Sequence, residues 1–127
     1  MEHGILIVDD NAMTRKLLRS TLRSANLYVV GEAGSGEAAI AMVEKLHPAI
    51  VCLDIFMPGM DGIETLKALK ASYPRIVVLM VTGNPFPEKV KEALSAGANG
   101  LLVKPFTPAK VMAALRVAMR RHEQEPS

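Results

Sequence analysis

The sequence predicts an α/β fold in which five parallel strands form one doubly wound sheet. Short apolar runs rich in Val, Ile and Leu recur at regular intervals along the chain, with little polar alternation. Such runs are typical of strands that helices cover on both faces. The segments between the runs place apolar residues at helical spacing, and Gly or Pro marks many of the boundaries. The pattern is therefore (βα)₅.

Each predicted strand is short. The five runs are residues 5–8, 28–31, 50–53, 76–81 and 101–103. Pro48 precedes the third run and Pro74 the fourth. Because right-handed crossovers place helices on both faces of a parallel sheet, we expect the common strand order 2-1-3-4-5. In that order the first and third strands are neighbours, and ligands bind beyond the carboxyl ends of the strands.

Each of the five predicted helices carries one apolar face at the spacing i, i+3/i+4 and i+7. The faces comprise Leu17, Leu18, Leu22 and Ala25; Ala39, Met42, Val43 and Leu46; Leu66, Leu69 and Tyr73; Val90, Ala93 and Leu94; and Val111, Leu115, Ala118 and Met119. Gly31, Gly34 and Gly36 are expected to break the chain before the second helix. Pro108 is expected in the first turn of the last helix, where a backbone N–H is not needed.

Length and composition limit the classes of protein that fit. A chain of 127 residues and 13.7 kDa has room for one domain. We expect that domain to span residues 1–122, with residues 123–127 as a polar tail or the start of a linker. Hydrophobic residues make up 50% and charged residues 22%, which excludes a disordered chain. The net charge of +2 is too small to indicate nucleic-acid binding.

The sequence also indicates a cellular compartment. No uncharged apolar run reaches the ~18 residues that a membrane span requires. The N-terminal residues lack the basic region of a secretory signal. A single cysteine excludes an internal disulfide and fits a reducing environment. We therefore expect a cytoplasmic protein without a membrane span.

Acidic side chains follow two strands that the predicted order makes neighbours. Asp9 and Asp10 end the first strand, and Asp54 ends the third. Two like charges ~4 Å apart repel by about 4 kcal/mol at an effective dielectric constant of ~20, so such a cluster requires a cation or a proton. Carboxylate oxygens with room for water suit Mg²⁺, or Mn²⁺. An alternative stays open, because Asp10 and Asn11 also suit the cap of the following helix.

Two further strands deliver polar side chains to the same edge. Thr82 ends the fourth strand and Lys104 ends the fifth. A metal ion and Lys104 would neutralise phosphoryl oxygens, and the Thr82 hydroxyl would supply a hydrogen bond to them. Asp54 is then left as a nucleophile that can accept a phosphoryl group as an acyl phosphate. The combination indicates phosphoryl chemistry.

At these residues the chain resembles the response-regulator receiver domain of two-component signalling. The motifs are Ile7-Val8-Asp9-Asp10-Asn11, Leu53-Asp54-Ile55-Phe56-Met57-Pro58-Gly59-Met60-Asp61-Gly62, Val81-Thr82-Gly83, and Ala96-Gly97-Ala98 leading to Val103-Lys104-Pro105-Phe106. Each falls on the structural element where the family carries it, and the resemblance covers nearly the whole chain. The length is similar to that of stand-alone receivers such as those of chemotaxis. The resemblance implies a flavodoxin-like fold.

The resemblance also implies roles for the acidic residues. Asp54 is expected to be the phosphoacceptor. Asp10 is expected to ligate Mg²⁺ directly, and Asp9 mostly through water. The backbone carbonyl of Phe56 is expected to complete the protein's share of the metal ligands, and the Phe56 side chain is expected at the mouth of the pocket.

Further residues are implied to contact the phosphoryl group or a partner. Thr82 and Lys104 are expected to contact the phosphoryl group, and the peptide bond before Pro105 is expected to be cis. The phosphodonor, a sensor histidine kinase or a histidine phosphotransfer protein, is expected to dock on residues from two segments beside the acidic pocket. The partner-binding residues are Arg15, Arg19, Pro105 and Phe106.

One position departs from the family pattern. Leu101 stands where receivers usually carry Tyr or Phe, a ring that turns inward on activation. Leucine offers no such ring, so that form of switching is not expected here. The phosphorylation site is unaffected by this difference.

The expected function is that of a phosphoacceptor module. Mg²⁺-dependent transfer of a phosphoryl group from a phosphohistidine to Asp54 would change its affinity for an unidentified downstream partner. We expect no enzyme in the turnover sense, no direct nucleic-acid binding, and a monomer or a phosphorylation-dependent dimer. One alternative is an aspartyl-phosphate phosphohydrolase, which calls for Asp-x-Asp after the first strand and a cap segment. The other is a receiver-like binding scaffold that is not phosphorylated, which the full set of site residues argues against.

Overall fold

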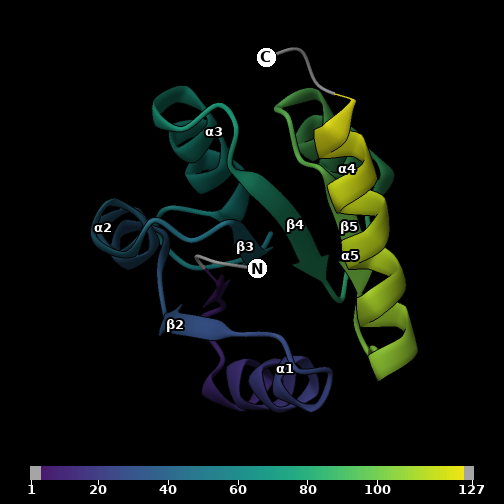
Figure 1. Cartoon of the computed structure of the whole chain (residues 1–127). Coiled ribbons are helices and arrows are strands. Elements are labelled where there is room, and N and C mark those ends of the chain that lie inside the picture. Colours follow the sequence, from purple (N-terminus) through teal and green to yellow (C-terminus); the bar gives the residue numbers. More distant parts are fainter. Residues whose placement is uncertain (1–3, 125–127) are drawn as a thin grey trace.

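The computed structural model describes residues 4–124, which form a five-stranded parallel sheet with helices on both faces (Figure 1). The strands are β1 (Ile5–Val8), β2 (Val29–Ala33), β3 (Ile50–Asp54), β4 (Val77–Thr82) and β5 (Gly100–Val103). The helices are α1 (Ala12–Ser24), α2 (Gly36–Leu46), α3 (Gly62–Ser72), α4 (Pro87–Ser95) and α5 (Pro108–Glu123). The strands lie in the order β2-β1-β3-β4-β5. The predicted fold class and strand order are confirmed.

Two apolar clusters attach the helices to the sheet. On one face, alternate strand residues pack against Leu22 of α1 and Leu115 of α5. On the other face, the intervening strand residues pack against Val43 of α2, Leu66 of α3 and Ala93 of α4. Figure 1 shows α1 and α5 on one side of the sheet, with α2 and α3 on the other. The helices thus form the two layers, one on each face, that a doubly wound sheet is expected to have.

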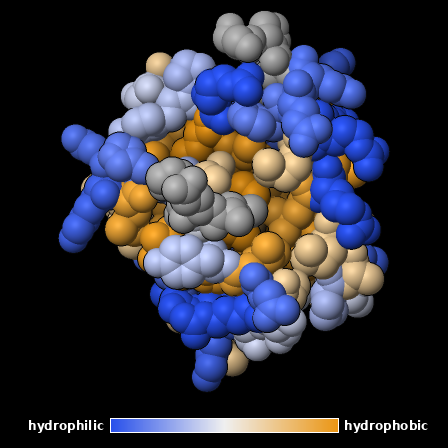
Figure 2. All heavy atoms as spheres, in the orientation of Figure 1, coloured by the Kyte–Doolittle hydropathy of each residue, from blue (hydrophilic) through white to orange (hydrophobic). Residues whose placement is uncertain are grey.

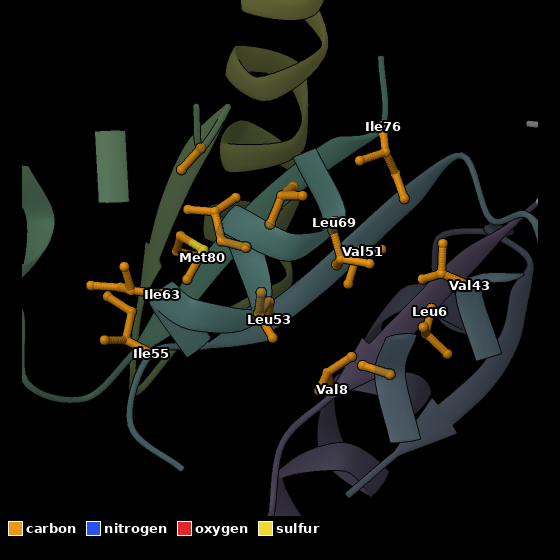
Figure 3. Packing of buried hydrophobic residues seen from close by; sticks show 14 of the residues in the cluster. Leu6, Val8, Val43, Val51, Leu53, Ile55, Ile63, Leu69, Ile76 and Met80 are labelled. Atoms are coloured by element: carbon orange, nitrogen blue, oxygen red, sulfur yellow. The ribbon is translucent and has the colours of Figure 1, made fainter. Parts of the chain in front are cut away.

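The central strands carry the core. Figure 3 shows Leu6, Leu53 and Met80 on three adjacent strands, with Leu6 beside Val43 of α2. In Figure 2 the apolar residues gather in the middle of the face turned to the viewer, with hydrophilic side chains around the margin. Every residue of β3 and β4 is buried. Polar residues within these two strands stand only at their carboxyl ends, where the site is built.

Three details of the sequence interpretation are wrong. Leu17 and Leu94 are 58% and 41% exposed, because their neighbours Leu18 and Ala93 face the sheet instead. One residue turns the chain by about 100° around a helix, so with Leu18 and Ala93 facing the sheet, Leu17 and Leu94 point toward solvent. Gly31 does not break the chain but lies inside β2.

Gly31 allows a helix to lie close to an unbroken strand. A Cβ at this position would lie 2.8 Å from Cε of Met42 and 3.3 Å from Cδ1 of Leu46, both on α2. Glycine inside a strand often marks such a close approach. The strand therefore continues to Ala33, and the following Gly34 and Ser35 make the turn, where Ser35 caps α2.

The last helix reaches the end of the described residues. α5 ends at Glu123, and Gln124 is its C-cap. Residues 125–127 of the expected polar tail lie outside the described part of the chain. Within residues 4–124, no helix combines the length and the apolarity that crossing a bilayer requires.

Gly62 places the start of α3 directly against the end of β3. Its N–H donates a hydrogen bond to the Ile55 carbonyl at 2.8 Å. A Cβ on Gly62 would collide with the backbone carbonyl of Asp54 and lie 2.7 Å from Cα of Ile55. The helix start is also fixed by a capping box between Asp61 and Glu64. The backbone that carries Asp54 is thus held between a strand and a helix terminus.

Gly62→Ala is expected to lower the free energy of unfolding by about 3 kcal/mol, the upper end of the usual cost of overpacking, because the crowded atoms belong to backbone. Gly83→Ala is the matched control, since its Cβ would lie 3.9 Å from Cβ of Lys104, an ordinary contact. Urea denaturation followed by circular dichroism measures both variants. Unfolding midpoints equal to that of the parent for both variants would contradict the close approach of α3 to β3.

Candidate functional site

The carboxyl ends of four strands bring polar side chains to one edge of the sheet. Asp9 follows β1, Asp54 and Thr82 are the last residues of β3 and β4, and Lys104 follows β5. Asp9 and Asp54 are 3% and 6% exposed, and Thr82 is fully buried. Because β1 and β3 pair directly, the two acids lie on adjacent strand ends. The convergence predicted from the strand order is confirmed.

Three carboxylates cluster at this edge. One oxygen from each of Asp9, Asp10 and Asp54 lies within 4.8 Å of the other two. Asp10 is exposed to solvent, whereas the other two are buried. Asn11 is the N-cap of α1, and its side chain accepts a hydrogen bond from the Thr14 N–H at 3.0 Å. The capping alternative therefore holds for Asn11 and does not account for Asp10.

Lys104 neutralises part of the negative charge. Its Nζ lies 2.9 Å from Oδ2 of Asp9 and 3.7 Å from Oδ2 of Asp54. The other oxygen of Asp9 accepts a hydrogen bond from the Asn11 N–H at 2.9 Å. One ammonium group in contact with two of three carboxylates leaves the cluster negative. Hard oxygen donors, one of them open to water, are the ligand set that fits Mg²⁺ or Mn²⁺.

The surroundings of Asp54 shift its pKa upward. Burial raises its pKa to about 6, and the charges of Asp9 and Asp10 act in the same direction. Lys104 opposes this shift, as does the Phe56 N–H, which lies 3.4 Å from Oδ1 of Asp54. An anion at this position is therefore under-compensated, and a cation would stabilise it.

The loop after β4 makes two contacts at the site, one with the Thr82 hydroxyl and one with the Phe56 ring. Thr82 Oγ1 accepts a hydrogen bond from the Asn84 N–H at 3.0 Å. Phe56 is 39% exposed, and its ring meets Phe86 edge-on, with centroids 6.1 Å apart and planes at 87°. Phe86 was not predicted as a site residue, because no periodicity or motif connects these two loops.

The two arginines expected to bind a partner form ion pairs with Glu32 of β2. Arg15 Nε lies 3.1 Å from Glu32 Oε1, and Arg19 Nη1 lies 2.7 Å from Glu32 Oε2. Arg15 Nη1 also donates to the Asp9 carbonyl at 2.6 Å. Hydrogen bonding from Arg19 is the main cause that lowers the pKa of Glu32, with Arg15 adding to it and burial opposing it. The pairing with Glu32 was not predicted, because Glu32 lies beyond residues 28–31, the predicted second strand, whereas β2 continues to Ala33.

The segment after β5 has the expected backbone geometry. The Lys104–Pro105 peptide bond is cis. Pro105 is exposed, while Phe106 is half-buried and packs against the apolar cluster beneath α1 and α5. Leu101 is half-buried and packs against the cluster on the opposite face.

Comparison with protein families agrees with this geometry. The family described as response regulator receiver domain matches residues 5–116. The chain belongs to this family. Among curated receiver relatives, the chemotaxis protein CheY of Thermotoga maritima is 38% identical over 115 residues, which cover 91% of this chain and 96% of that protein. The DNA-binding response regulator MtrA of Mycobacterium tuberculosis strain H37Rv is 33% identical over 127 residues, but the chain spans only 55% of its length.

Solved receiver structures are similar throughout. Chemotaxis protein CheY4 of Vibrio cholerae, crystallised at low pH, superposes with a TM-score of 0.82 at 35% identity, covering 88% of this chain and 94% of that one. CheY from a CheX–CheY–BeF₃–Mg complex of Borrelia burgdorferi gives a TM-score of 0.87 at 32% identity, with 91% and 87% covered. The receiver fold is thus shared over almost the full length of the chain.

Ionisation of Asp54 is expected to lower the free energy of unfolding of the metal-free receiver. The folded pKa of about 6 lies above the ordinary value of 3.8, so the native state binds the proton more tightly than the unfolded chain does. Stability is then fully retained below pH ~4 and falls as the pH rises through ~6. Asp54→Asn should therefore raise the free energy of unfolding at pH 8 in chelator by roughly 1–3 kcal/mol, and much less at pH 4.

Chemical denaturation at both pH values measures this difference. Glu44→Gln is the matched control, because it removes an exposed carboxylate of α2 outside the site. A gain that is equal at pH 4 and pH 8, or a loss of stability in Asp54→Asn at pH 8, would contradict the account of a carboxylate under-compensated by its surroundings.

Proposed function

We propose that this receiver accepts a phosphoryl group on Asp54 from a phosphohistidine and thereby changes its affinity for a downstream partner. The observation that carries the proposal is the environment of Asp54. It is a buried carboxylate clustered with two other acids, and an ammonium nitrogen lies 3.7 Å away. Such surroundings suit a nucleophile whose product carries more negative charge than the reactant.

In the proposed transfer, Asp54 is the nucleophile, and Lys104 and Thr82 stabilise the phosphoryl oxygens. One Asp54 oxygen attacks phosphorus, the P–N bond to the donor imidazole breaks, and the imidazole leaves with the electron pair. Lys104, already held beside the site, faces the added negative charge. Thr82 is proposed to donate its hydroxyl hydrogen to a phosphoryl oxygen. That hydrogen is not used in the bond with the Asn84 N–H, because Thr82 Oγ1 is the acceptor there.

The metal ligands are proposed from the same cluster. Asp10 would bind Mg²⁺, or Mn²⁺, directly, Asp9 mostly through water, and Asp54 and the backbone carbonyl of Phe56 would complete the protein's share. The ion would neutralise phosphoryl oxygens while the group is transferred. The clustering of three carboxylate oxygens within 4.8 Å supports this assignment.

The proposed phosphodonor is a sensor histidine kinase or a histidine phosphotransfer protein. It would dock beside the pocket, on Arg15 and Arg19 of α1 and on Pro105 and Phe106 after β5. The Borrelia structure, a complex with CheX, BeF₃ and Mg, supports a receiver that also meets a protein partner. We propose that the protein acts stoichiometrically rather than as an enzyme, in the cytoplasm, as a monomer or a phosphorylation-dependent dimer. Residues 1–122 would form the functional unit, with residues 123–127 as a tail or linker.

Incubation with acetyl phosphate and Mg²⁺ is expected to give one acid-stable, base-labile phosphoryl group per chain. Mass spectrometry should place it on Asp54, and Asp54→Asn should carry none, because its amide is not nucleophilic. Glu44→Gln, which changes an exposed acid outside the site, should be labelled like the parent. Release of many phosphates per chain would favour the phosphohydrolase alternative, and no adduct on the parent would favour the scaffold.

Binding of Mg²⁺ should stabilise the folded parent, because the ion relieves repulsion that only the native state contains. At a concentration 100 times the dissociation constant, the gain is about 2.7 kcal/mol. Asp10→Asn should remove most of this gain, since it removes the exposed ligand of the cluster. Glu88→Gln, an exposed acid of α4, is the control and should keep it.

Thermal unfolding with Mg²⁺ and with chelator measures the gain in each variant. An Mg²⁺-dependent shift of the same size in Asp10→Asn and in the parent would remove Asp10 from the metal ligands.

A further inference from the structure

Two aromatic side chains from different loops meet beside the site. Phe56 lies between β3 and α3, and Phe86 is the N-cap residue of α4. They are 39% and 55% exposed, yet their rings pack edge to face with centroids 6.1 Å apart. This pair, here called the aromatic clasp, contributes nothing to either apolar core cluster. Its position needs another explanation than core packing.

A continuous path of contacts runs from Asp54 through the aromatic clasp to Thr82. The Phe56 N–H lies 3.4 Å from Oδ1 of Asp54. On the other side, the Phe86 N–H donates to the Asn84 carbonyl at 2.8 Å, and the Asn84 N–H donates to Thr82 Oγ1 at 3.0 Å. The two rings complete the path. The Thr82 hydroxyl is therefore connected to Phe56 through residues 83–86 and one ring contact.

Two prolines restrict the backbone conformations that Phe86 can adopt. Pro85 and Pro87 flank it, and proline restricts both its own φ and the conformation of the residue before it. Phe86 adopts an extended conformation, with φ −60° and ψ 130°, and makes no side-chain cap hydrogen bond to α4. A Ser, Thr, Asp or Asn would cap this helix better, so helix capping does not account for a phenylalanine at this position.

We propose that Phe86 is a positioning residue that holds the Phe56 ring against the Asp54 pocket, so that the aromatic clasp slows hydrolysis of the phosphoryl group. The inference rests on the proposed phosphorylation of Asp54. In hydrolysis, a water oxygen attacks phosphorus, the bond from phosphorus to the Asp54 oxygen breaks, the carboxylate leaves with the electron pair, and the water releases its proton to solvent. An apolar ring at the entrance cannot orient that water and restricts its access.

The test compares first-order decay of the Asp54 adduct after removal of acetyl phosphate, in Mg²⁺, among variants. Phe86→Ala should speed decay about threefold to tenfold, the factor by which an aromatic pair of ordinary strength biases its closed arrangement. Phe56→Ala should speed it at least as much. The double variant should decay no faster than Phe56→Ala, because Phe86 acts through Phe56. Phe86→Tyr keeps the ring and should keep the slow decay.

Leu94→Ala is the matched control, since it also removes an exposed apolar side chain of α4. Unchanged decay in Phe86→Ala, or effects of the two phenylalanines that multiply in the double variant, would overturn the positioning role. Faster decay in Leu94→Ala as well would attribute the effect to a loosened α4 and would also overturn it. Failure of the parent to form any adduct would instead overturn the proposed function, and the clasp's role with it.

A second measurement needs neither metal nor phosphate. The chain has three phenylalanines, Phe56, Phe86 and Phe106, so their ring signals in proton NMR can be assigned by substitution. In metal-free protein, Phe86→Leu should shift the Phe56 ring signals, because the edge-to-face neighbour is lost, and leave those of Phe106 in place. Phe56 signals unaffected by Phe86→Leu would show that the rings are not in contact in solution and would overturn the proposal.

Discussion

The burial of two neighbouring carboxylates is the constraint on which the rest of the structure depends. Asp9 and Asp54 lie on adjacent strand ends, and an ionised carboxyl out of water is costly unless a cation faces it. Lys104 supplies that cation. It follows β5, an edge strand that β4 separates from β3. Neighbouring strands lie ~4.8 Å apart, so the lysine side chain has to pass the end of β4.

The segments that leave the strands differ in how firmly they are held. After β1, the Asn11 N–H binds Asp9 and the Arg15 guanidinium binds the Asp9 carbonyl. After β3, the Gly62 N–H binds the Ile55 carbonyl and its Cα lies against the backbone of Asp54. After β4, residues 83–88 are all exposed. Since exposed segments with few buried contacts are the ones that open most readily, the acids stand on rigid supports, while the loop beside Thr82 is the part able to respond.

The sequence predicted the parts of the site that topology alone determines. Apolar runs gave the strands, and parallel pairing then required their carboxyl ends to converge, which is enough to bring Asp54 and Lys104 together. Contacts that depend on the rotation of a helix or the path of a loop did not follow from the same signals. Apolar spacing left open whether Leu17 or Leu18 faces the sheet. The meeting of Phe56 with Phe86 depends on the conformations of two loops, for which no periodic pattern exists.

The thiol in the middle of the sheet has a consequence for how the protein meets oxidants. Cys52 lies two residues before Asp54 in β3 and is 1% exposed, and burial raises its pKa to about 12. Reagents and peroxides attack the thiolate, which the folded molecule neither forms near neutral pH nor presents to solvent. Oxidative damage can therefore reach this residue only when β3 leaves the sheet. The rate at which a thiol reagent modifies Cys52 thus reports global opening of the fold, independently of any signal at the strand ends.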